Sequence, residues 1–98
     1  MYDVLIVGKG PAGISASLYT VRAGLKTLAV GLPVSDSLFR ADKIENYYGF
    51  DEPLSGQDLY LAGVRQAQRL GVELEEAEVL GIEKHEHFTV KTSVGSFV

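Results

Sequence analysis

The chain contains no cysteine and no tryptophan among its 98 residues. Without cysteine, this stretch cannot form a disulfide, a cysteine-ligated zinc site or a thiol nucleophile. Long apolar runs are also missing: the first one ends after four residues, far short of the roughly 20 that a membrane-spanning helix requires. Asp3 stands where a secretory signal would carry basic residues. These absences favour a cytoplasmic protein with no membrane partner.

Positive charge is scarce as well. Nine lysines and arginines oppose 13 aspartates and glutamates, which leaves a net charge of −4, and no basic run occurs. Nucleic-acid binding depends on clustered basic residues, so nucleic acid is not the expected partner. The length and the 46% hydrophobic content are those of at most one small globular domain.

The first residues hold the most specific motif, the stretch DVLIVGKGPAG. An apolar run predicts a buried parallel strand over Val4–Val7. Gly8, Gly10 and Gly13 follow in the spacing G-x-G-x-x-G. In such a motif the glycines allow a tight turn, close approach of a pyrophosphate to the backbone, and close packing of the helix on the strand. The motif predicts dinucleotide binding.

A helix and a second strand complete the unit. Pro11 suits the first helical turn, and the helix is expected to run to about Ala23, with Gly24 ending it. The apolar stretch KTLAV predicts a strand over 26–30. These elements form a βαβ unit of about thirty residues. The glycine spacing indicates dinucleotide binding only within such a unit.

The acidic residue that usually follows a dinucleotide motif is missing from its normal place. An aspartate or glutamate at the end of the second strand commonly bonds a ribose hydroxyl, but Val30 and Gly31 stand there. Asp36 is the next acidic residue after Asp3, several positions into the loop. The gap weakens a simple NAD interpretation. The gap does not favour NADP either, because an NADP site would need an arginine close after the second strand, and the next arginine is Arg40.

The remainder predicts a loop, a helix and several strands. Residues 31–53 lack periodicity but are rich in aromatic residues, and we interpret them as a folded, ligand-facing segment. Ser55 and Asp58 form a capping box that starts a helix closed by Gly71. Alternating stretches from Val72 onward predict successive strands, with turns near 85–86 and 93–95. The predicted fold class is α/β: a Rossmann-like FAD/NAD(P)-binding βαβ unit with a parallel sheet, followed by a C-terminal antiparallel β-meander.

The segments MYDVLIVGKGPAGISASLYTVRAGLKTLAV, IENYYGF and LSGQDL together resemble the low-molecular-weight thioredoxin reductases and their flavoprotein relatives. The resemblance covers residues 1–71 and, more loosely, 72–98. It implies that the glycine motif binds the FAD pyrophosphate, that an asparagine lies beside the flavin and that backbone near one valine meets the adenine. The cofactor-binding residues so implied are Gly8, Gly10, Pro11, Ala12, Gly13, Gly31, Ser35, Asp36, Ser37, Leu38, Asn46 and Val79.

One segment departs from the family. Thioredoxin reductases carry Gly-Gly-Gln-Leu after the second strand, where this chain has Ser35, Asp36, Ser37 and Leu38. The substitution implies an altered flavin site or an unusual redox partner. In this respect the chain is similar to atypical clostridial-type members, some of which take electrons from ferredoxin.

The resemblance also carries expectations about the whole protein. Residues 1–98 would be the N-terminal portion of a discontinuous FAD-binding domain in a chain that continues beyond Val98. An NAD(P)H domain, a possible C-x-x-C pair and a closing segment would lie outside it. A thioredoxin-like or ferredoxin partner and a homodimer are implied for the full-length protein. No catalytic side chain is expected in this segment, since the flavin carries the chemistry.

The sequence is also compatible with two other functions. The βαβ unit would also serve a non-redox module that binds NAD(P) or another dinucleotide for sensing. Alternatively, the 98 residues alone are a structural fragment that holds no ligand.

Several other residues invite a functional interpretation. A metal site at His85 and His87 is disfavoured, because further ligands are not evident. The acidic residues near position 75 are expected to face solvent rather than to act in catalysis. Tyr47 and Tyr48 either stack on a flavin or fill a small local core. Lys9 is a candidate for neutralising phosphate charge. Arg40 is a candidate for offsetting the negative charge of a reduced flavin. An Arg40→Ala variant with unchanged flavin affinity and redox potential would refute that role.

Overall fold

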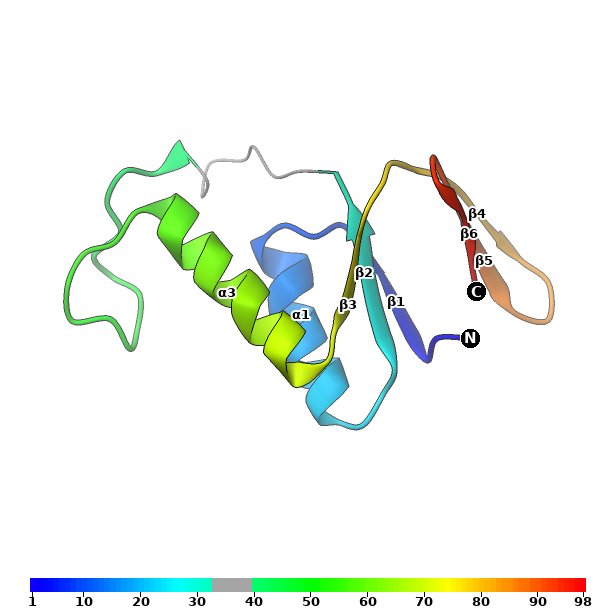
Figure 1. The fold of residues 1–98 in the computed structure, drawn as a ribbon, viewed down its shortest axis with the longest axis horizontal. Helices are drawn as coiled ribbons and strands as arrows, with labels where there is room; N and C mark the ends of the chain where they lie inside the picture. The colour runs from blue at the N-terminus through cyan, green and yellow to red at the C-terminus, as the bar shows by residue number, and fades with distance from the viewer. Residues whose placement is uncertain (33–39) are drawn as a thin grey trace.

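A computed structural model describes residues 1–32 and 40–98, which form two sheets and two long helices (Figure 1). In chain order the elements are β1 (Val4–Val7), α1 (Pro11–Arg22), β2 (Thr27–Gly31), α3 (Gly56–Leu70), β3 (Glu73–Glu76), β4 (Val79–Lys84), β5 (Phe88–Thr92) and β6 (Gly95–Phe97). The predicted α/β class and the predicted βαβ unit are confirmed.

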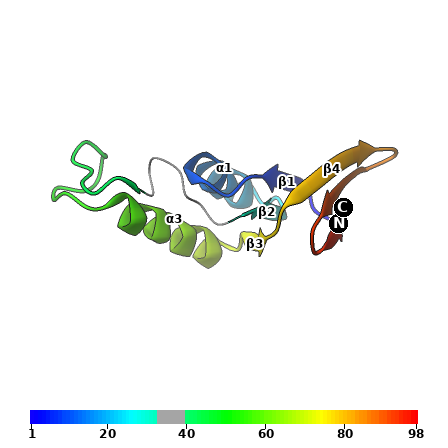
Figure 2. The same ribbon diagram turned by 90° about the horizontal axis from the view of Figure 1, so that it is seen from above.

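The first sheet is parallel, with the strand order β1-β2-β3. Its central strand β2 is buried from Thr27 to Val30, which explains why this stretch is a continuous apolar run rather than an alternating one. Figures 1 and 2 both show α1 and α3 on one side of this sheet and the second sheet on the other. The core therefore lies between the helices and the parallel strands.

Side chains from both helices and the central strand meet in this core. The buried members are Ile14, Ala29, Ala67 and Val72, and Leu18 and Val21 pack against them. The expected apolar face of α1 is therefore the face that packs on the sheet. Small residues at Ala29 and Ala67, both fully buried, leave room for the helices to approach the strands closely.

Local capping explains where the helices begin and end. The Ser55 side chain accepts a hydrogen bond from the main-chain nitrogen of Asp58 at 3.0 Å, which satisfies one open donor at the start of α3. Gly71 ends α3 with a φ of 104°, a left-handed conformation that glycine adopts without steric cost. The predicted start and end of this helix are confirmed.

The structure refines the assignment of the strands. The sequence alternation from Val72 onward does not show which sheet each strand joins. β3 pairs with β2 in the parallel sheet, because α3 carries the chain back across it. Only β4, β5 and β6 form the antiparallel meander, with an irregularity between Val79 and Gly81. The second strand runs over Thr27–Gly31, one residue later than expected.

No helix in the described part of the chain is long and apolar enough to span a bilayer.

Candidate functional site: a glycine loop at the start of helix α1

The glycine loop, residues 8–13, links the end of β1 to the start of α1 (Figure 1). Gly8 turns the chain with a φ of 111°, and its N–H donates a 2.7 Å hydrogen bond to the Val30 carbonyl in β2. Gly10 is the N-cap residue of α1, and Pro11 occupies the first helical turn. The loop therefore lies at the carboxyl end of the parallel strands, where ligands bind in open α/β sheets.

Gly13 is required by the packing of α1 on the loop. A β-carbon at this position would lie 2.1 Å from the Gly8 carbonyl oxygen and 3.3 Å from a methyl group of Ile6. The oxygen is a main-chain atom and cannot rotate away. Only glycine therefore lets the first turn of α1 lie this close to the strand that precedes it, as the spacing of the motif predicts.

Gly31 serves the same loop from the neighbouring strand. A β-carbon here would lie 2.9 Å from the main-chain nitrogen of Lys9 and 3.3 Å from Cα of Gly8. The Gly31 carbonyl accepts a 3.0 Å hydrogen bond from the N–H of Ala77, just after β3. The end of β2 is thus packed between the glycine loop and the chain that leaves β3.

The first turn of α1 is a suitable site for an anion. The N–H groups at the start of a helix have no partner within the helix, and here the first helical bond runs from the N–H of Ile14 to the Gly10 carbonyl. Gly10 has no side chain to cap the donors of Ala12 and Gly13, and no acidic residue lies in the first turn. The open donors and the helix dipole both favour a phosphate group here.

Lys9 does not direct its charge to the start of α1. Its side chain is largely buried, at 14% exposure, and its Nζ lies 3.7 Å from a carboxylate oxygen of Glu76. Its Cγ packs close to Gly31, since a β-carbon placed there would lie 3.3 Å away. The ammonium group therefore pairs with the end of β3, and the donors described at the start of α1 are main-chain N–H groups.

Tyr60 is a residue that the sequence did not single out. It lies on α3, and its hydroxyl donates a 2.6 Å hydrogen bond to the carbonyl of Lys9 in the glycine loop. The two residues are 51 positions apart, so no local pattern could reveal the contact. Glycine spacing is readable from the sequence because it acts within one turn, whereas this bond depends on how α3 packs on α1.

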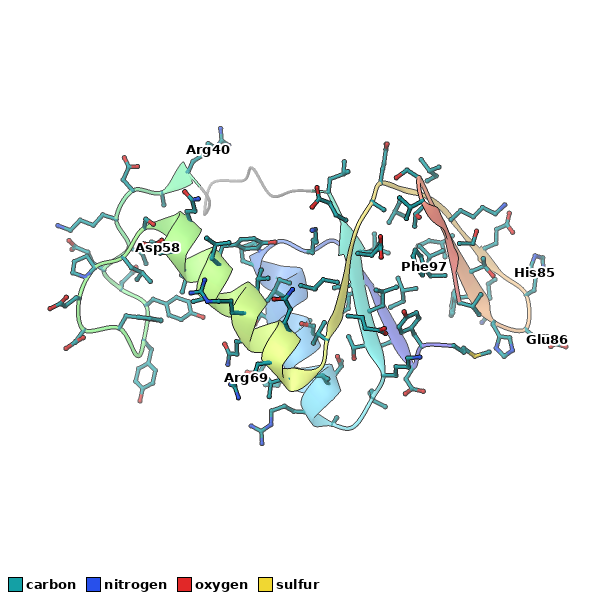
Figure 3. The ribbon with its side chains drawn as sticks, in the orientation of Figure 1. Arg40, Asp58, Arg69, His85, Glu86 and Phe97 are labelled. Carbon is teal, nitrogen blue, oxygen red and sulfur yellow. The ribbon has the colours of Figure 1, made fainter. Side chains whose placement is uncertain are left out.

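The other predicted cofactor residues are less closely tied to the loop. Asn46 is exposed, and Val79 is half-buried at the start of β4. In the part of the chain that the structure describes, no hydrogen bond or ion pair connects Asn46 or Val79 to the glycine loop. The predicted residues Ser35, Asp36, Ser37 and Leu38 lie outside the described residues. Arg40, two positions after Leu38, points outward in Figure 3.

The two adjacent tyrosines differ. The Tyr47 ring packs edge-to-face on Phe50, with ring centroids 6.0 Å apart, whereas Tyr48 is 99% exposed. Tyr47 and Phe50 line one end of a cavity of about 150 Å³ between α1 and α3, which Pro11 and Tyr60 also line. Tyr47 therefore contributes to a small local cluster.

The histidine pair lies at the tip of the β4–β5 hairpin, far from the glycine loop. Figure 3 shows His85 and Glu86 pointing outward there. The His85 side chain is 82% exposed and lies 3.9 Å from Glu83. The described residues hold no group of three or more metal-ligating side chains.

Comparisons with known proteins cover nearly the whole chain, although no protein-family model matches it. A thioredoxin reductase from Aquifex aeolicus is 44% identical over 81 residues, which is 82% of this chain and 25% of that protein. The structure of a thioredoxin reductase from Gloeobacter violaceus matches 98% of this chain and 31% of its own, with a TM-score of 0.90 and 36% identity. A ferredoxin-flavin thioredoxin reductase from Clostridium acetobutylicum matches 97% of this chain and 34% of its own, with a TM-score of 0.78 and 30% identity. The chain thus spans about a third or less of these proteins.

Proposed function

Because this chain has the fold and homologous sequence of part of a thioredoxin reductase, we propose that it is the FAD-binding part of a flavoprotein oxidoreductase. Residues 1–98 would form the N-terminal portion of a discontinuous FAD-binding domain. In the complete protein, NAD(P)H or ferredoxin would supply electrons and an acceptor, such as a disulfide, would take them. We place no acid, base or nucleophile in these residues.

The observation that carries the proposal is the glycine loop itself. Two glycines are packed so tightly that a side chain at either would strike main-chain atoms. The start of α1 offers open N–H groups with no competing acidic residue in its first turn. These features suit the pyrophosphate of a dinucleotide, which combines negative charge with a need for close backbone approach.

FAD, when bound, would supply two-electron transfer at its flavin ring. The chain's own share is binding and orientation. The N–H groups of Gly10, Ala12 and Gly13 would face the pyrophosphate, and Gly31 would keep β2 clear of the loop. Asn46 and Val79 remain proposed contacts for the flavin and the adenine, and Ser35–Leu38 would adjoin the cofactor with Gly31.

Two observations bear on the electron donor. The segment Ser35–Leu38 differs from the usual family sequence, and a relative that matches this chain is a ferredoxin-flavin thioredoxin reductase. Both observations support ferredoxin as a donor alongside NAD(P)H. A thioredoxin-like acceptor and a homodimer are further proposals that rest on the family resemblance, and a cytoplasmic location is a proposal that rests on the sequence.

A visible absorption spectrum of the complete purified protein tests the proposal. We expect flavin bands near their usual wavelengths, and heat-released cofactor that elutes with authentic FAD. Reduction by NADPH and by reduced ferredoxin, followed separately, would then identify the donor. A colourless protein that also fails to take up added FAD would contradict the proposal and favour the alternative, a dinucleotide-binding or sensing module without redox chemistry.

A further inference from the structure

We propose that Tyr60 is a positioning residue for the dinucleotide, an inference that rests on the proposed role of the glycine loop. The Tyr60 hydroxyl donates a 2.6 Å hydrogen bond to the carbonyl of Lys9, the residue between the first two glycines of the motif. The bond joins α3 to a loop that links β1 to α1 and also contacts β2. It is a direct contact between α3 and the glycine loop.

The geometry of the peptide bond turns this contact into control of a ligand-facing group. The carbonyl of Lys9 and the N–H of Gly10 belong to one planar trans peptide, so they point in opposite directions. When Tyr60 holds the carbonyl toward α3, the Gly10 N–H must point away from α3. Among residues 1–32 and 40–98, no group accepts a hydrogen bond from that N–H.

The position of Gly10 makes this orientation consequential. Gly10 is the N-cap residue of α1, next to the open donors of the first helical turn. Without a fixed carbonyl, a Lys9–Gly10 peptide could rotate, because glycine tolerates backbone conformations that other residues avoid. The fixed points on either side are the bond from the Gly8 N–H to Val30, two peptides earlier, and the bond from the Ile14 N–H to the Gly10 carbonyl, one peptide later. Tyr60 therefore fixes the peptide that the glycine itself leaves free.

The surroundings of Tyr60 support a stable bond rather than a transient one. The residue is half-buried and lines the cavity between α1 and α3 together with Pro11 and Ile14. It also packs against the buried core that holds the helices on the sheet. Such packing limits rotation of the ring, so the hydroxyl remains directed at the loop.

The test is a Tyr60→Phe variant of the complete protein, which removes the hydroxyl and keeps the ring. We expect the dissociation constants for FAD and for ADP to rise about 3- to 10-fold, as the loss of a neutral hydrogen bond implies. The ³¹P resonances of bound ADP should also shift, because the donor set around the phosphates changes. Tyr19→Phe is the matched control, since Tyr19 on α1 is 78% exposed and its hydroxyl makes no such bond to the loop.

The outcomes separate this inference from the proposed function. Wild-type affinity and unchanged ³¹P resonances in Tyr60→Phe would overturn the role of Tyr60, even if the protein binds FAD. Weakened ADP binding in the variant of a protein that does not bind FAD would support the role of Tyr60 and overturn the flavoprotein proposal. A wild-type protein that binds neither FAD nor ADP would overturn both.

A measurement on the wild-type protein covers the case in which the variant does not fold. In ¹H–¹⁵N spectra, the amide proton of Gly10 should move downfield when ADP is added, because it gains a phosphate acceptor. The control is the amide of Gly8, which already donates to Val30 and should change little. An unchanged Gly10 resonance at saturating ADP would overturn the inference.

Discussion

Gly13→Ala is predicted to create a direct conflict with a main-chain atom. The added β-carbon would lie 2.1 Å from the Gly8 carbonyl oxygen, where ordinary contacts are 3.4 Å or longer. The loop or α1 must therefore move by more than an ångström. Gly8 cannot move alone, since its N–H is bonded to Val30 in the fully buried central strand.

Two opposing effects determine the magnitude. Overpacking of this kind costs about 1–3 kcal/mol. Alanine is a better helix former than glycine by about 1 kcal/mol, which offsets part of that cost. We expect a net loss of up to about 2 kcal/mol in the free energy of unfolding. We also expect at least a tenfold rise in the dissociation constant for FAD, about 1.4 kcal/mol, because the donors of the first turn are displaced.

The chain supplies its own control in Gly63→Ala on α3. A β-carbon at Gly63 would meet only a methyl group of Ile14, at an ordinary distance of 3.7 Å. This variant should gain up to about 1 kcal/mol of stability and keep its FAD affinity. Urea unfolding of the apoprotein and fluorescence titration with FAD measure both quantities. A Gly13→Ala protein that unfolds and binds FAD like Gly63→Ala would refute the steric argument.

Three further predictions test other parts of the chain. Gly31→Ala should weaken FAD binding more than it lowers the free energy of unfolding, because its β-carbon would press on the Lys9 nitrogen at 2.9 Å. Titration with FAD measures the affinity, and equal affinities of the variant and wild type would contradict this prediction. Ser55→Ala should lower the free energy of unfolding by about 1 kcal/mol, because α3 loses its N-cap. Ser55→Asp should restore most of that stability, and an unchanged free energy of unfolding in Ser55→Ala would contradict the role of the cap. Burial and the nearby Glu73 carboxylate raise the pKa of Tyr2, so Tyr2 loses its proton at lower pH in the unfolded chain than in the folded one. The free energy of unfolding should therefore fall as pH rises above about 10. An equal pH dependence of the free energy of unfolding in wild type and Tyr2→Phe would contradict this prediction.

The parts of the fold that the sequence predicts are those governed by short-range rules. The glycine spacing, Pro11 in the first turn of α1, and the Ser55 cap each act within a few residues, and the structure contains all three. The buried strand β2 was readable because a strand covered on both faces needs no polar alternation.

The features that escaped prediction depend on packing between distant segments. The stretch around β3 alternates like the later strands, and only the path of α3 places it in the parallel sheet. The bond between Tyr60 and Lys9 spans 51 positions. The direction of the Lys9 ammonium follows from Glu76 at the end of β3, which no local motif connects to the glycine loop.

The composition of the glycine loop has a consequence for the conditions under which a ligand would stay bound. The donors at the start of α1 are peptide N–H groups, and the residues that carry them have no ionisable side chain. Peptide groups neither gain nor lose a proton across the roughly pH 5 to 9 that cells experience, whereas histidine side chains titrate within it. Lys9, the cation within the loop, is already paired with Glu76. The pyrophosphate of a dinucleotide held by this loop would therefore be retained through swings in cellular pH that would loosen a site built from histidines.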